Sequence, residues 1–129
     1  RYPAHALAAL REAGITYGGW LPNFEVPQVF GRYRVTVHVP RRPYTRALPG
    51  IPTIRPFEAL ACGTPVAALP VAGPIDIVTD AVGALSFDLA RAIDAALFCT
   101  RADCAALGAS YSWAAATDQF LAGLADCTA

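Results

Sequence analysis

Apolar and polar residues alternate between Arg34 and Val39, which is typical of a β-strand with two unlike faces. One face carries Tyr33, Val35, Val37 and Val39, and the other carries Arg34, Thr36 and His38. Two apolar runs, Pro65–Leu69 and Val82–Leu85, predict buried strands, and Ile15–Tyr17 predicts a further short strand.

Apolar residues at helical spacing predict helices between and after these strands. The expected helices are Pro3–Ala13, a short turn at Glu25–Phe30, a helix from about Thr53 or Arg55 to Cys62, and then Phe87–Cys99, Arg101–Leu107 and Trp113–Ala125. A loop rich in arginine, proline and glycine is expected from Pro40 to about Pro52. Strands that alternate with helices predict an α/β fold, a Rossmann-like parallel sheet flanked by helices.

Composition supports one soluble domain over residues 1–129, since 55% of the residues are hydrophobic and 16% are charged. No transmembrane segment is expected, because Pro70, Gly73 and Pro74 interrupt the longest apolar run. The four cysteines form no CxxC pair, which argues against a zinc site and favours reduced thiols in a cytoplasmic protein, with attachment to a membrane surface still open. The chain begins without Met, so we expect it to be part of a longer protein.

Positive charge is concentrated in one stretch of the sequence. Between Val26 and Phe57 there are six arginines and no acid, whereas the rest of the chain holds four arginines and all ten acids. The six are Arg32, Arg34, Arg41, Arg42, Arg46 and Arg55. Such a stretch attracts anions, unless the fold brings acids close enough to pair with individual arginines.

Glu58 is the single acid in the helix that follows this stretch. In open α/β sheets, ligands bind beyond the carboxyl ends of the strands, where the next helix begins and its N–H groups favour a phosphate. The Arg34–Val39 strand ends at this edge and is expected to deliver Arg41, Arg42 and Arg46 there. Arg55 falls in the first turn of that helix, and Glu58 lies about one turn deeper. Its carboxylate could accept hydrogen bonds from both hydroxyls of a ribose, or it could pair with Arg55 on the helix surface. Both interpretations stay open.

Residues 50–66, GIPTIRPFEALACGTPV, resemble the donor-domain signature of glycosyltransferases built from two Rossmann-like domains, the GT-B type. Three other segments are similar to elements of the same domain, in the same order along nearly the whole chain: GGWLPNFEVPQVFGRYRVTVHVP, GPIDIVTDAVGAL and YSWAAATDQFLAGL. The segment RRPYTRALPGIPTIRPFEALACG resembles a subgroup that includes spore-maturation types.

The resemblance implies roles for individual residues. Glu58 corresponds to the ribose-binding glutamate, and the loop around Pro52–Ile54 to the one that meets the diphosphate. Gly50 stands where many retaining members carry a first glutamate beside the donor sugar. Recognition of that sugar by a carboxylate is then either absent or passed to Arg41, Arg42 or Thr53.

The activity implied is transfer of a sugar, of the hexosyltransferase type, from a nucleotide-diphosphate sugar to a carbohydrate or other hydroxyl acceptor. Neither a metal ion nor another cofactor is expected, because positive side chains and a helix terminus can stabilise the leaving diphosphate. The acceptor side and the catalytic base would come from a missing N-terminal domain, so residues 1–129 alone are expected to be inactive. His38 is expected to be a hydrogen-bonded strand residue, and Trp113 a core residue.

Two other classes of function are weighed against this one. The first is a non-catalytic, degenerate module that binds a nucleotide-sugar, and Gly50 favours it. The second is a nucleic-acid binder that uses the arginines, but the stretch holds few aromatic residues and no recognition motif, so no nucleic-acid partner is expected.

Overall fold

The computed structural model describes residues 3–40, 42–47, 53–71 and 77–126, and its centre is a three-stranded parallel sheet. The strands β1 (Thr36–His38), β2 (Val66–Ala68) and β3 (Gly83–Leu85) lie side by side in that order. Val37 pairs with Ala67, which pairs with Ala84. The prediction of an α/β, Rossmann-like fold is confirmed.

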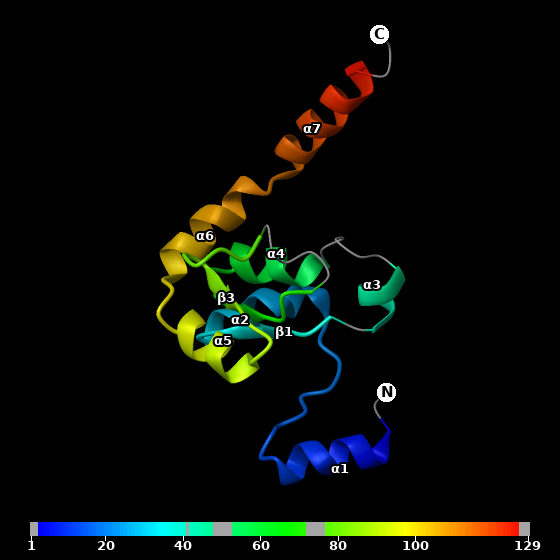
Figure 1. Ribbon diagram of the computed structural model, residues 1–129, viewed down its shortest axis with the longest axis vertical. Helices are drawn as coiled ribbons and strands as arrows, with labels where there is room; N and C mark the ends of the chain where they lie inside the picture. The colour runs from blue at the N-terminus through cyan, green and yellow to red at the C-terminus, as the bar shows by residue number, and fades with distance from the viewer. Residues whose placement is uncertain (1–2, 41, 48–52, 72–76, 127–129) are drawn as a thin grey trace.

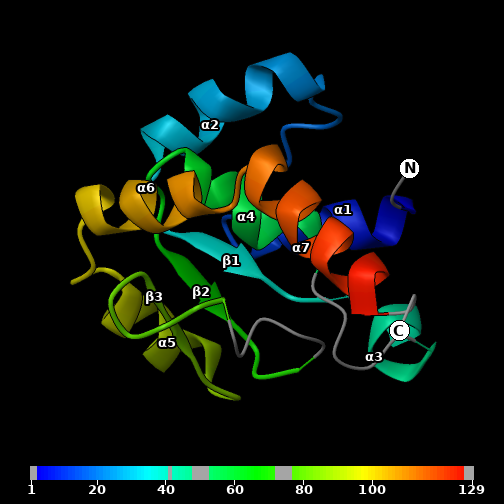
Figure 2. The same ribbon diagram turned by 90° about the horizontal axis from the view of Figure 1, so that it is seen from above.

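Helices cover both faces of this sheet. The helices α2 (Val26–Arg32), α4 (Ile54–Ala61) and α6 (Arg101–Ser110) lie on one side, and α5 (Leu89–Ala96) packs against β2 and β3 on the other (Figures 1 and 2). Helix α1 (Ala4–Glu12) and helix α7 (Trp113–Asp126) project from opposite ends of this layered body (Figure 1). A 3-10 turn, Asn23–Glu25, precedes α2.

The apolar core has two parts, one on each side of the sheet. The larger part fills the space between the sheet, α4 and α6 and contains Leu60, Val66, Ile77, Val78, Val82 and Cys104. The smaller part joins Ala67 of β2 to Ala92 and Ala96 of α5. The small side chains of the second part allow α5 to lie close to the strands.

The loop predicted after Pro40 contains a short helix, α3 (Arg42–Ala47), so that part of the prediction is wrong. Pro43 stands at the second position of α3. Proline has its φ fixed near the helical value and lacks an N–H that the first turn does not need. A proline that was taken to mark a loop therefore starts a helix.

The strand predicted at Ile15–Tyr17 does not form, and these residues have no regular secondary structure between α1 and the 3-10 turn. A strand is stable only beside a partner, and the described sheet does not reach this segment. The prediction that Trp113 lies in the core is also wrong, because its side chain is 90% exposed on α7. Helix α7 extends away from the layered body (Figure 1), so the body does not cover the Trp113 side chain.

The two faces of β1 alternate as predicted, but the polar face is the more buried one. His38 is only 8% exposed, whereas Val37 and Val39 on the opposite face are about half exposed, at 47% and 54%. Val35 begins the valine face and packs against the small core on the α5 side. Because α5 covers β2 and β3, the valines farther along β1 stay open.

Gly108 of α6 marks a close contact between two helices. A methyl group added there would lie 2.5 Å from the Ala61 nitrogen and 2.6 Å from the Leu60 carbonyl carbon. Both atoms belong to the α4 backbone, which cannot move without displacing the core. The absence of a side chain therefore determines how closely α4 and α6 approach.

We expect Gly108→Ala to lower the free energy of unfolding by about 2 kcal/mol, the usual cost of overpacking a core. Urea unfolding followed by circular dichroism measures this. Gly123→Ala is the matched control, since nothing lies within 4 Å of the position on α7 where the methyl group would stand. An equal loss in both variants would contradict the explanation by close packing.

Candidate functional site

The end of β1 and the beginning of α4 border one open hollow of about 660 Å³. Its walls include His38, Val39 and Pro40 from β1 and the residues after it, and Thr53, Ile54, Arg55 and Pro56 from the start of α4. A hollow of this size suits part of a nucleotide or a similar small molecule. It lies at the carboxyl end of the strand, where the sequence predicted a ligand site.

Thr53 and His38 meet inside this hollow. The Thr53 Oγ1 atom lies 3.4 Å from the His38 Nε2 atom. Burial lowers the pKa of His38 below its usual value, so its imidazole is neutral at pH 7. The prediction that His38 is a hydrogen-bonded strand residue is confirmed.

Arg55 and Glu58 form an ion pair on the surface of α4. The Arg55 Nη1 atom donates to Glu58 Oε2 at 2.7 Å, and the side chains are 54% and 29% exposed. This is the pairing that the sequence left open as the alternative to ribose binding. Arg55 lines the hollow, whereas Glu58 lies one turn deeper and is not among the described residues that line it. Since an exposed pair contributes only about 0.5 kcal/mol, a ligand can replace it at small cost.

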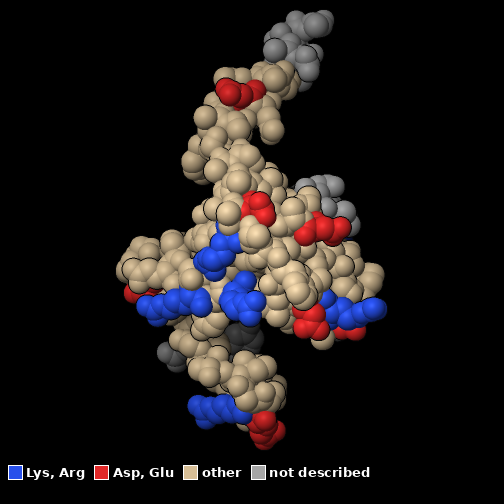
Figure 3. Space-filling model, turned by 90° about the vertical axis from the view of Figure 1, so that its left-hand side faces the viewer, with Lys and Arg blue, Asp and Glu red and all other residues tan. Residues whose placement is uncertain are grey.

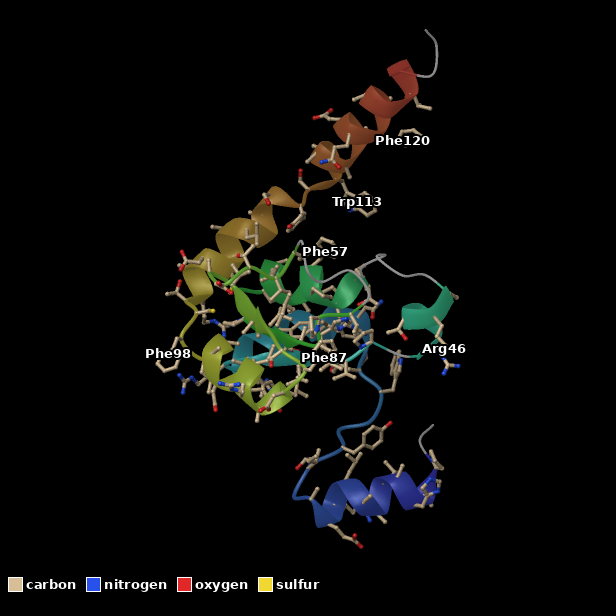
Figure 4. All side chains as sticks on the ribbon, viewed as in Figure 1. Arg46, Phe57, Phe87, Phe98, Trp113 and Phe120 are labelled. Atoms are coloured by element: carbon tan, nitrogen blue, oxygen red, sulfur yellow. The ribbon has the colours of Figure 1, made fainter. Side chains whose placement is uncertain are left out.

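Of the arginines expected at this rim, Arg55 lines the hollow, whereas Arg46 is not among the described residues that line it. Arg34 lies at the amino end of β1 and donates from Nη2 to the Leu97 carbonyl at 3.5 Å. Arg46 points outward from α3 (Figure 4). Basic side chains are instead prominent on the side of the molecule where α5 and α6 meet (Figure 3).

Arg101, which lies outside the basic stretch, stabilises the edge of the sheet where the strands begin, at the end opposite the hollow. Its Nη1 atom donates to the Tyr33 carbonyl at 3.0 Å, and its Nη2 atom donates to the Cys62 carbonyl at 3.2 Å. Two arginines, Arg34 and Arg101, therefore satisfy backbone carbonyls at the amino edge. The local sequence does not distinguish an arginine that binds backbone carbonyls from one that binds an anion.

Four of the predicted site residues cannot be placed in the hollow. Arg41, Gly50 and Pro52 lie outside the described residues, and the side chain of Arg42 at the start of α3 is not described either. The described members, Thr53, Ile54 and Arg55, come together at the start of α4. The roles of the other four stay predictions.

Metal and thiol chemistry find no support in the described part of the chain. No three of its His, Cys, Asp or Glu side chains lie together as metal ligands would. Cys62, Cys99 and Cys104 are free, and burial raises the pKa of Cys104 to about 11, so its thiol stays protonated at pH 7. None of the described helices is both long and apolar enough to cross a bilayer.

Comparison with known proteins gives one match. A sequence model of the family described as glycosyl transferase-like matches residues 1–121, which is nearly the whole chain. The chain belongs to the glycosyl transferase-like family. No curated protein and no solved structure matched it. Membership in this family supports a glycosyltransferase-type function, with a sugar donor and an acceptor as partners.

From the burial of the His38 imidazole we can predict how the stability of the protein depends on pH. Burial lowers the pKa of His38 in the folded protein below about 6.5, its value in the unfolded chain, so the unfolded chain takes up a proton first as the pH falls. The free energy of unfolding therefore declines between pH 7 and pH 5. In His38→Phe we expect this part of the decline to disappear.

Urea unfolding at several pH values measures the effect. His5→Phe is the control, because His5 is exposed on α1. A pH dependence that is the same in wild type and His38→Phe would contradict the assignment.

Proposed function

We propose that this chain is the donor-binding domain of a GT-B type glycosyltransferase of the spore-maturation-like subgroup. It would hold a nucleotide-diphosphate sugar where β1 ends and α4 begins, for transfer of a hexosyl group to an acceptor hydroxyl. One observation carries the proposal: the segment that resembles the donor signature forms the start of α4 and borders an open hollow. Membership in the glycosyl transferase-like family supports it.

The start of α4 suits a diphosphate for two reasons. The first-turn N–H groups and the helix dipole present partial positive charge to the hollow. The Arg55 guanidinium adds a full charge at the same place. During transfer, negative charge develops on the leaving diphosphate, and these fixed groups would stabilise it without a metal ion.

Glu58 suits the ribose rather than the phosphates, because two negative groups repel each other. Its carboxylate now accepts one hydrogen bond from Arg55. Two vicinal hydroxyls could donate to the same carboxylate, and Arg55 would then be free to turn toward the diphosphate. The ion pair in the structure would in this way represent the donor-free state of the site.

The donor sugar would be recognised without the first glutamate of the retaining members, because Gly50 stands at that position. Arg41, Arg42 and Thr53 are the proposed replacements. The same Gly50 favours a second candidate, a module that binds nucleotide-sugar without transferring it. Binding of the donor without turnover in the complete protein would favour that candidate.

The sheet itself supports the proposal that a longer protein contains this domain. Among the described strands β1 pairs only with β2, so its other edge is open. A second hollow, of about 1480 Å³, separates α2 from Leu7 and Tyr17. Open edges of this kind are normally paired or covered. Further parallel strands of the same protein would fill this space, and an N-terminal domain would supply the acceptor site, so residues 1–129 alone would be inactive.

The first test is Glu58→Gln in the full-length protein. We expect the loss of charged hydrogen bonds to weaken binding of the nucleotide-sugar by roughly 1–3 kcal/mol. Isothermal titration and kcat/KM measure this. Glu12→Gln is the control, since Glu12 is exposed at the end of α1. Unchanged binding and kinetics in Glu58→Gln would remove Glu58 from the site.

The second test compares two ligands in Arg41→Ala and Arg42→Ala. We expect both variants to lose more affinity for a nucleoside diphosphate than for the nucleoside, because we propose that the two guanidinium groups contact the diphosphate as well as the donor sugar. Arg46→Ala is the control, since Arg46 points outward from α3 (Figure 4). Equal losses for both ligands would contradict a role at the diphosphate.

A further inference from the structure

The turn between α5 and α6 carries the most exposed phenylalanine among the described residues. The Phe98 side chain is 89% exposed and points outward from the body (Figure 4). Tyr33, which follows α2, is 61% exposed. Single exposed apolar side chains are common on protein surfaces, so neither ring indicates a binding surface by itself. The groups around the two rings decide what they can bind.

Two arginines join Phe98 and Tyr33 into one surface. The Arg34 Nη2 atom donates to the carbonyl of Leu97, the residue before Phe98, at 3.5 Å. The Arg101 Nη1 atom donates to the Tyr33 carbonyl at 3.0 Å. The end of α2, the start of β1 and the α5–α6 turn thus meet at the edge of the sheet where the strands begin. We call Tyr33, Arg34, Phe98 and Arg101 the amino-edge patch.

The amino-edge patch carries positive charge that no described acid pairs with. Both of its guanidinium groups are exposed, and neither forms an ion pair with an acid in the described part of the chain. Their hydrogen bonds go to uncharged carbonyls and leave further N–H groups available to another acceptor. Arg32, exposed at the end of α2, adds a third positive charge next to Tyr33.

The acids nearest to the patch along α5 and α6 are Asp94 and Asp103. The Asp103 carboxylate accepts a hydrogen bond from the Thr100 hydroxyl at 2.6 Å. Figure 3 shows basic groups together in the middle of this side of the molecule, with acidic groups nearer its margins. The charges are therefore separated rather than mixed, and the basic ones surround an apolar tip.

The shape of the patch favours a flat partner. None of its four residues lines either of the two hollows described above. A small ligand needs a recess that surrounds it, and single-stranded nucleic acid is usually held in a groove that follows its backbone. Phe98 instead protrudes from a turn (Figure 4). The surface of an anionic bilayer offers phosphates to guanidinium groups and, just below them, an apolar layer to an aromatic ring.

We propose that the amino-edge patch docks the protein onto a membrane surface that contains anionic phospholipids. Arg34 and Arg101 would bind the lipid phosphates, and the Phe98 ring would enter the layer between the head groups and the acyl chains. The hollow at the opposite end of the sheet would then face away from the membrane and stay open to water. The inference does not depend on the ligand proposed for that hollow, because the patch shares no residue with it.

Flotation of the full-length protein with lipid vesicles tests the proposal. One set of vesicles contains phosphatidylcholine and phosphatidylglycerol in equal amounts, and the other contains phosphatidylcholine alone. We expect the wild type to bind the anionic vesicles, and to bind them less as the salt concentration rises, because salt screens exposed charges. Absence of binding to the anionic vesicles, or equal binding to both kinds, would overturn the proposal.

Two variants remove the two components of the patch separately. Arg34→Gln should bind anionic vesicles about fivefold more weakly, which is the usual contribution of one basic residue near such a surface. Phe98→Ser should show a similar loss because it removes the apolar tip, whereas Phe98→Trp should bind at least as well as the wild type. Both side chains are exposed, so these changes leave the core intact. Unchanged binding in Arg34→Gln and Phe98→Ser would contradict the assignment.

Two matched controls lie elsewhere on the molecule. Phe87→Ser removes a ring that is 78% exposed after β3, at the other end of the sheet, and Arg11→Gln removes an exposed charge from α1. Both should bind vesicles like the wild type. If the controls lost as much as the patch variants, overall charge or hydrophobicity would explain the binding, and the patch would have no special role.

Titration of the same variants with single-stranded poly(U) distinguishes a membrane from a nucleic acid as the partner. We expect any binding of poly(U) to be the same in the wild type, Arg34→Gln and Phe98→Ser. Loss of poly(U) binding in these variants while vesicle binding stays at the wild-type level would make the patch a nucleic-acid surface and overturn the proposal.

Discussion

The packing of α4 between the sheet and α6 is the constraint on which the rest of the structure depends. Ala59 and Leu60 of α4 are fully buried, and Gly108 brings the α6 backbone against the end of α4. Gly63, with a φ of +66°, then turns the chain into β2. The carboxyl end of α4 is fixed in this way, and its start lies beside the end of β1, where Thr53 Oγ1 is 3.4 Å from His38 Nε2. The candidate site follows from this arrangement.

The sequence predicted this central part well because its information is local. A helix with a proline in its first turn and a glycine just after its end, followed by an apolar strand, specifies α4 and β2 with little help from other segments. The start of α4 and the end of β1 could therefore be brought together from sequence by the rule for parallel sheets. Of the predicted site residues that the structure describes, those at the start of α4 adjoin the hollow.

The predictions that were wrong concern segments whose structure depends on residues distant in the sequence. Ile15–Tyr17 has the composition of a strand but no strand beside it, and Trp113 has the character of a core residue on a helix that leaves the body. The distribution of the basic residues depends on the fold for a related reason. A run of arginines in the sequence does not say which way each side chain points, and Arg34 at the start of β1 lies one strand length from the rim where Arg55 lines the hollow.

The uncapped start of α4 links stability to function in one place. An N-cap typically contributes about 1 kcal/mol, and this chain uses that contribution at α5, α6 and α7. At α4 a capping residue type is present in Thr53, but Pro56 has no N–H at the third helical position, which is the position that the hydroxyl caps of α6 and α7 use. Departures of this kind concentrate at sites where a ligand completes the structure. The start of α4 therefore keeps the N–H groups of Ile54 and Arg55 without a side-chain acceptor beside the hollow, and under the proposed function a diphosphate would supply the acceptors there.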